Sequence, residues 1–155
     1  MSNYLIPLMV IVPMLCAILV NAFAKFNKSI KVLTFVVAIC LPIIPLISNY
    51  GLHFFGGYTP MVDNVTGVIY HPAITYSFDM LQQIFIAAIG LITFLVAFIY
   101  LSKYKKASGQ YLFLLFMGTA SVTALMLTDD IFNMFVFFEI LALVQVGIVI
   151  ASPMD

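Results

Sequence analysis

Five long apolar runs dominate this sequence, and few charges interrupt them. We predict membrane spans over residues 5–24, 32–48, 80–101, 111–128 and 131–151. A helix of about 20 residues rises about 1.5 Å per residue and matches the hydrocarbon core of a bilayer. A helix also satisfies its own backbone amides, which lipid cannot do. The sequence therefore predicts an all-α integral membrane protein, with residues 1–155 forming a single transmembrane domain.

The composition limits what such a chain can do. It is 65% hydrophobic and only 8% charged, which is too little polar surface for an ordinary soluble domain. The net charge is zero and the lysines form no long stripe, so we expect no nucleic-acid partner. The spans use up the 155 residues, so we expect no catalytic chemistry and no cofactor in this chain. Its expected partners are lipid and other membrane subunits.

The cysteines and histidines do not indicate a metal site. Cys16 and Cys40 both lie in apolar runs, where a cysteine behaves as a small buried hydrophobe. His53 and His71 stand 18 residues apart without a second pair of ligands. We therefore predict structural or surface roles for all four.

The segment between the second and third spans has a different character. Residues 49–77 are rich in Gly, Pro, Tyr, Thr and Asn, and Gly56-Gly57 and Asp63-Asn64 are turn signals. The stretch Val65–Tyr70 has the composition of a short hairpin. We predict a loop or short hairpin outside the hydrocarbon.

The lysines predict the orientation of the chain. All six lie in the loops that follow the first and third spans, and there is no arginine. The positive-inside rule places these loops in the cytoplasm. In the cell membrane the N-terminus, residues 49–77 and the Asp129-Asp130 turn would then face outward, and the C-terminus would be cytoplasmic.

Glu139 is the residue that most directly suggests a function. It lies eight residues into the fifth span, about 12 Å along the helix axis, which is too deep for its side chain to reach the headgroups. A charged residue at such a depth costs roughly 2.5–3.5 kcal/mol on insertion scales. Carboxyl groups in this setting usually mark ion pathways. The alternative is a protonated carboxyl that serves packing alone.

No partner for Glu139 is found on its own helix face. Asn133 and Gln145 lie about 120° away on either side. The positions three, four and seven residues away are apolar: Phe132, Phe135, Val136, Ala142, Leu143 and Val146. No lysine lies at membrane depth, so we predict that another polypeptide supplies the partner.

Asp79 and Asp130 are secondary candidates for ion handling. Asp79 precedes the third span and has Gln82 three positions later, as in a capping box. Asp130 opens the fifth span, where an anion suits the positive end of the helix dipole. Capping explains both residues, and Asp130 is also placed to accept a proton or cation from outside.

A longer motif surrounds Glu139. The run Leu-Thr-Asp-Asp-Ile-Phe-Asn-Met-Phe-Val-Phe-Phe-Glu-Ile-Leu, residues 127–141, resembles the fifth-span motif of antiporter-like subunits. Respiratory complex I, Mrp-type sodium/proton antiporters and membrane-bound energy-converting hydrogenases share these subunits. Their pattern is Gly or Asp, then Asp-Leu-Phe-Asn, an aromatic stretch and Phe-Glu. The turn at residues 56–60 and Asp79 resemble the family's Gly-Gly-Trp-x-Pro and the Asp that follows it.

The resemblance implies a role in ion translocation. It covers essentially the whole chain but only the first five of about fourteen family helices. In the family the fifth-span glutamate pairs with a lysine on a broken seventh helix, which this sequence does not contain. The expectation is therefore the N-terminal part of a split subunit in a larger ion-pumping complex, with Glu139 as the residue that handles the proton or sodium ion. The alternatives are a structural or assembly subunit without a transport step, and a channel built from several copies.

Overall fold

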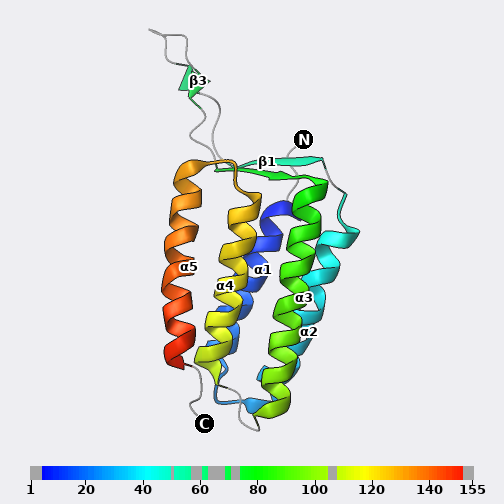
Figure 1. The fold of residues 1–155 in the computed structure, drawn as a ribbon, viewed down its shortest axis with the longest axis vertical. Helices are drawn as coiled ribbons and strands as arrows, with labels where there is room; N and C mark the ends of the chain where they lie inside the picture. Colours follow the sequence, from blue (N-terminus) through cyan, green and yellow to red (C-terminus); the bar gives the residue numbers. More distant parts are fainter. Residues whose placement is uncertain are drawn as a thin grey trace.

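The computed structural model describes residues 5–49, 51–56, 61–62, 69–70, 74–104 and 108–151. Five helices stand side by side in a bundle (Figure 1). Each is long and apolar enough to cross a membrane. The predicted all-α membrane fold with five spans is therefore confirmed. The helices are α1 (Leu5–Ala22), α2 (Asn27–Ile47), α3 (Met80–Lys103), α4 (Gly109–Leu127) and α5 (Ile131–Ala151).

Short strands lie between α2 and α3, where a loop or hairpin was predicted. β1 (Leu52–Gly56) and β4 (Ile74–Phe78) pair antiparallel, with Leu52 opposite Phe78. This pair lies across one end of the bundle (Figure 1). β2 (Met61–Val62) pairs with β3 (Ile69–Tyr70), so the last two residues of the predicted hairpin stretch are in a strand. Residues 57–60, 63–68 and 71–73, which include His71, lie outside the described residues.

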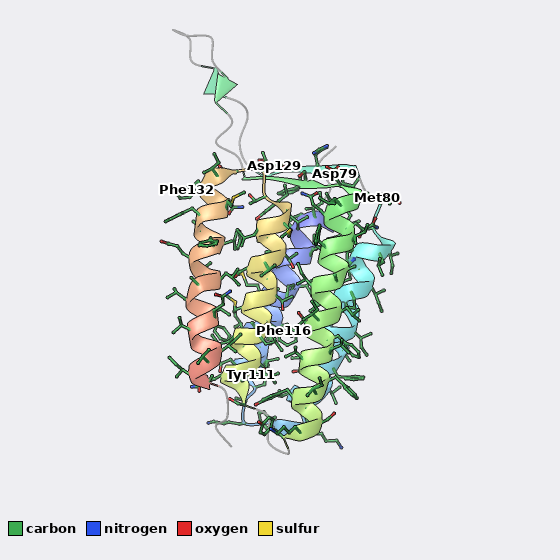
Figure 2. All side chains as sticks on the ribbon, in the orientation of Figure 1. Asp79, Met80, Tyr111, Phe116, Asp129 and Phe132 are labelled. Carbon is green, nitrogen blue, oxygen red and sulfur yellow. The ribbon has the colours of Figure 1, made fainter. Side chains whose placement is uncertain are left out.

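The bundle has two buried clusters, one toward each end. The cluster near the strands includes Tyr76 and Phe78 of β4 together with Ile6 and Leu127, so β4 closes that end of the bundle. The other cluster is built around Phe116 of α4, which Figure 2 places lower in the bundle. The most extensive helix contacts join α2 to α3, α1 to α4 and α4 to α5.

The end opposite to the strands carries the four lysines that the structure describes. α2 begins at Asn27 rather than at residue 32, so Lys28 and Lys31 lie in its first turns. The Lys31 ammonium donates to the carbonyl of Tyr104 at 3.1 Å, just beyond the end of α3. A lysine suits this position because the last carbonyls of a helix have no partner within the helix. The connections α1–α2 and α3–α4 therefore lie at the same end of the bundle (Figure 1).

The α2–α3 contact depends on Gly90. α2 remains one helix through Pro42 and Pro45, and α3 passes directly against it. A Cβ atom on Gly90 would lie 2.6 Å from the nitrogen of Pro42 and 2.7 Å from the carbonyl carbon of Leu41. Both are backbone atoms, so no side-chain rotation relieves the clash.

We expect Gly90→Ala to force α2 and α3 apart and to destabilise the bundle by about 1–3 kcal/mol, as overpacked cores do. Denaturant titration in detergent measures this change. Gly147→Ala is the matched control, because there the added Cβ meets only the side chain of Leu114. Equal stability of the two variants would contradict the close backbone approach.

Candidate functional site

Glu139 lies on the face of α5 that points away from the bundle. α5 packs mainly along α4. Only 6% of the apolar stretch that would cross the membrane is buried in α5, against 28–44% in the other helices. Its buried residues are Asn133 and Val144. Glu139 is exposed and lies about 140° around the helix from Val144, so its carboxyl is directed away from α4. It lies two turns along from Phe132, which Figure 2 shows at the edge of the bundle.

The surroundings of Glu139 on this outer face are apolar. Of the described lysines, Lys25 lies in the connection between α1 and α2. Lys28 and Lys31 lie in the first turns of α2, and Lys103 ends α3. None of these lysines is near the middle of α5. The outer face itself exposes large hydrophobic side chains: Phe132, Phe135, Phe138, Leu143, Val146 and Ile150. Within the described residues, Glu139 is thus a carboxyl without a cation at its depth.

Asp130 caps α5 and does not approach Glu139. Its two carboxylate oxygens accept from the backbone N–H groups of Phe132 and Asn133, both at 3.2 Å. These amides have no partner inside the helix, and the negative charge suits the positive end of the helix dipole. Nine residues separate Asp130 from Glu139, about 13 Å along the helix axis. The structure gives Asp130 a complete capping role.

Asp79 caps α3 in the predicted manner. The side-chain oxygen of Gln82 accepts from the Asp79 backbone N–H at 2.7 Å, as in a capping box. Asp79 itself is exposed at the strand end of the bundle (Figure 2). It is therefore not brought together with Glu139.

The same end holds a polar network that the sequence alone did not reveal. The amide nitrogen of Gln82 donates to Ser77 and to the Met126 carbonyl, and the Ser77 hydroxyl donates to Asp129 at 2.8 Å. Buried Asn133 donates to the hydroxyls of Tyr76 and Thr128, at 3.2 and 3.1 Å. These bonds join β4, the start of α3 and the α4–α5 turn. The Asn133 within the motif is therefore a structural residue of this network.

A groove of about 250 Å³ runs beside α5, on a different side of the helix from Glu139. It is mainly apolar, with Gln145 of α5 along one wall. Thr93 of α3 and Thr119 of α4 line it as well, and their hydroxyl oxygens lie 2.9 Å apart.

Comparisons with known proteins agree with this fold. No family model matches the sequence. The chain is 38% identical over 152 residues to uncharacterized protein MJ1309 of Methanocaldococcus jannaschii. The aligned residues make up 97% of this chain and 30% of that protein. The fold of the present chain matches that of a chain in the structure of the membrane-bound sulfane sulfur reductase (MBS), an archaeal respiratory membrane complex. That match has a TM-score of 0.74 and 20% identity, and covers 98% of this chain and 31% of the other. This chain therefore spans about a third of each similar protein.

Two substitutions of Asp130 separate capping from ion handling. We expect Asp130→Ala to destabilise the protein by about 1 kcal/mol, because two helix amides lose their acceptor. Asp130→Asn keeps an oxygen acceptor and should retain nearly full stability. Thermal unfolding in detergent measures both, and ion transport by the stable Asn variant is the second readout. Loss of transport at unchanged stability would show that the charge of Asp130 does more than cap α5.

Proposed function

We propose that this chain is a membrane subunit of a larger ion-translocating complex, in which it forms the first five spans of an antiporter-like module. Glu139 handles the transported proton or sodium ion. The observation that carries the proposal is the outward placement of Glu139 on a helix that packs mainly against α4. The resemblance of residues 127–141 to the family motif and the fold match to a chain of a respiratory membrane complex support it.

The cost of the exposed carboxyl favours a partner over a lipid contact. A charge facing hydrocarbon near the middle of a helix is disfavoured by several kcal/mol, whereas a charge facing protein finds a partner. This chain matches about 30% of the length of its relative, which leaves the partner of Glu139 to be proposed from the chemistry of the carboxyl. We propose that lysine-bearing helices of a second chain cover the outer face of α5 and place an ammonium near Glu139.

The coupling mechanism follows from the residue types. Apolar surroundings favour the protonated form of a carboxyl, whereas a nearby ammonium favours its ionised form. Movement of the partner lysine away from Glu139 would therefore promote proton uptake, and its return would promote release. A rearrangement elsewhere in the complex then shifts the population between loaded and unloaded states. Other parts of the complex supply the driving reaction.

The key test is Glu139→Gln, which keeps the shape of the side chain and removes its charge. We expect proton or sodium pumping by the complex in native membrane vesicles to be abolished while the complex remains assembled. Phe138→Leu is the matched control, because it changes the adjacent exposed side chain without touching a charge. Pumping by the Gln variant at the parent rate would refute the role of Glu139.

The same variant distinguishes the alternative role in assembly. If Glu139 only docks a neighbouring subunit, the Gln variant should weaken co-purification of that subunit while the remaining intact complexes still transport ions. Transport after reconstitution of this chain alone would instead indicate a channel made of several copies.

The proposed orientation places the lysine end in the cytoplasm and the β1–β4 end outside. We expect a membrane-impermeant maleimide added to intact cells to label His53→Cys and to leave Lys28→Cys unlabelled. Both positions are exposed in the structure. Permeabilised cells are the control in which both label, and the parent chain gives the background from Cys16 and Cys40. The reverse labelling pattern would show that the chain has the opposite orientation in the membrane.

A further inference from the structure

A small cavity lies inside the bundle, where α1, α2, α3 and α4 meet. The space available to the centre of a water molecule is about 10 Å³, close to the minimum that one buried water needs. Two of its lining residues are polar, Thr119 and Thr123, both on α4. The remaining lining residues are Met9, Val12, Leu41, Ile44, Ile86 and Gly90.

α1 and α2 line this cavity with the same local pattern. Met9 and Val12 of α1 are followed by Pro13, and Leu41 and Ile44 of α2 are followed by Pro45. Both prolines lie inside helices and are fully buried. A proline has no N–H, so it cannot donate to the carbonyl four residues earlier. The carbonyls of Met9 and Leu41 therefore lack their usual helical donors, and both residues line the same cavity.

The threonines of α4 bring hydroxyl groups to the cavity. Thr119 donates to the Leu115 carbonyl and Thr93 donates to the Ile89 carbonyl, each at 2.9 Å, while the two hydroxyls lie 2.9 Å from each other. Thr123 is 3% exposed and lines the cavity, so its hydroxyl can donate a hydrogen bond to a group held there.

We propose that the cavity holds one ordered water molecule. This water donates to the carbonyls of Met9 and Leu41 and accepts a hydrogen bond from Thr123. Buried waters typically make about three hydrogen bonds to polar groups that would otherwise be unsatisfied. A cation fits less well, because no carboxylate lines the cavity to offset its charge. The proposal does not depend on the role of Glu139.

The water extends the polar groups of α4 into the bundle. Thr119 lines both the cavity and the groove beside α5, and its contact with Thr93 lies between them. α1 and α2 can then face the cavity without leaving carbonyls unsatisfied in an apolar interior.

Radiolytic footprinting tests the proposal, because X-rays convert bound water into hydroxyl radicals that oxidise nearby methionine. Mass spectrometry of the full-length protein in native membranes reports each methionine separately. Met9 is 5% exposed, whereas Met117 is only half-buried and does not line the cavity. We expect Met9 to be oxidised several-fold faster than Met117. A Met9 rate equal to or below that of Met117 would overturn the proposal without any variant.

Two matched substitutions locate the water. Thr123→Val keeps the side-chain shape and removes the hydroxyl, so Met9 oxidation should fall several-fold while Met117 is unchanged. Thr34→Val is the control, because Thr34 is equally buried, has no partner among the described residues and lies outside the cavity lining. An unchanged Met9 rate in Thr123→Val would overturn the assignment. A parent Met9 rate that falls when sodium replaces choline would also overturn it, in favour of a cation.

Discussion

The structure depends on one constraint, which is that a polar group in hydrocarbon must find its partner within protein. The helices meet this constraint for most of their backbone, and Thr93, Thr119 and Ser121 return their hydroxyls to carbonyls four residues earlier. The helix ends, the buried prolines and Glu139 lie outside this regular pattern. Each of them requires a partner of a different kind.

At the strand end, the solution is a shared polar network. Asp130 supplies acceptors to the first amides of α5, and Gln82 binds the backbone of Asp79 while its amide nitrogen reaches Met126 at the end of α4. Because β4 contributes Ser77 and Tyr76 to the same network, the segment between α2 and α3 is held against the α4–α5 turn. The aspartates therefore have structural roles at the starts of α3 and α5.

The sequence predicted the elements whose signals are local. Five spans follow from run length and hydropathy, and the pairing of Asp79 with Gln82 follows from a spacing of three residues. The β1–β4 pair was not predicted, because it joins strands separated by 17 residues and depends on contacts across the end of the bundle. The second span was predicted to start at residue 32, with Lys28 and Lys31 in a loop, but α2 begins at Asn27. The ammonium of Lys31 donates to carbonyls at the end of α3, a contact that the sequence does not show. Helical spacing fixed the angle between Asn133 and Glu139 but not which of them faces α4.

The observed arrangement of α5 bears on what covers it. A helix that only faced lipid would place polar side chains inward and apolar ones outward. α5 does place Asn133 inward, where it is buried and hydrogen-bonded, yet it exposes Glu139 and Gln145 on other sides. A carboxyl on the outer face of such a membrane helix favours a protein neighbour over lipid. In the proposed function, the outer face of α5 is an interface with another subunit, and the chemistry of Glu139 belongs to that interface rather than to this chain alone.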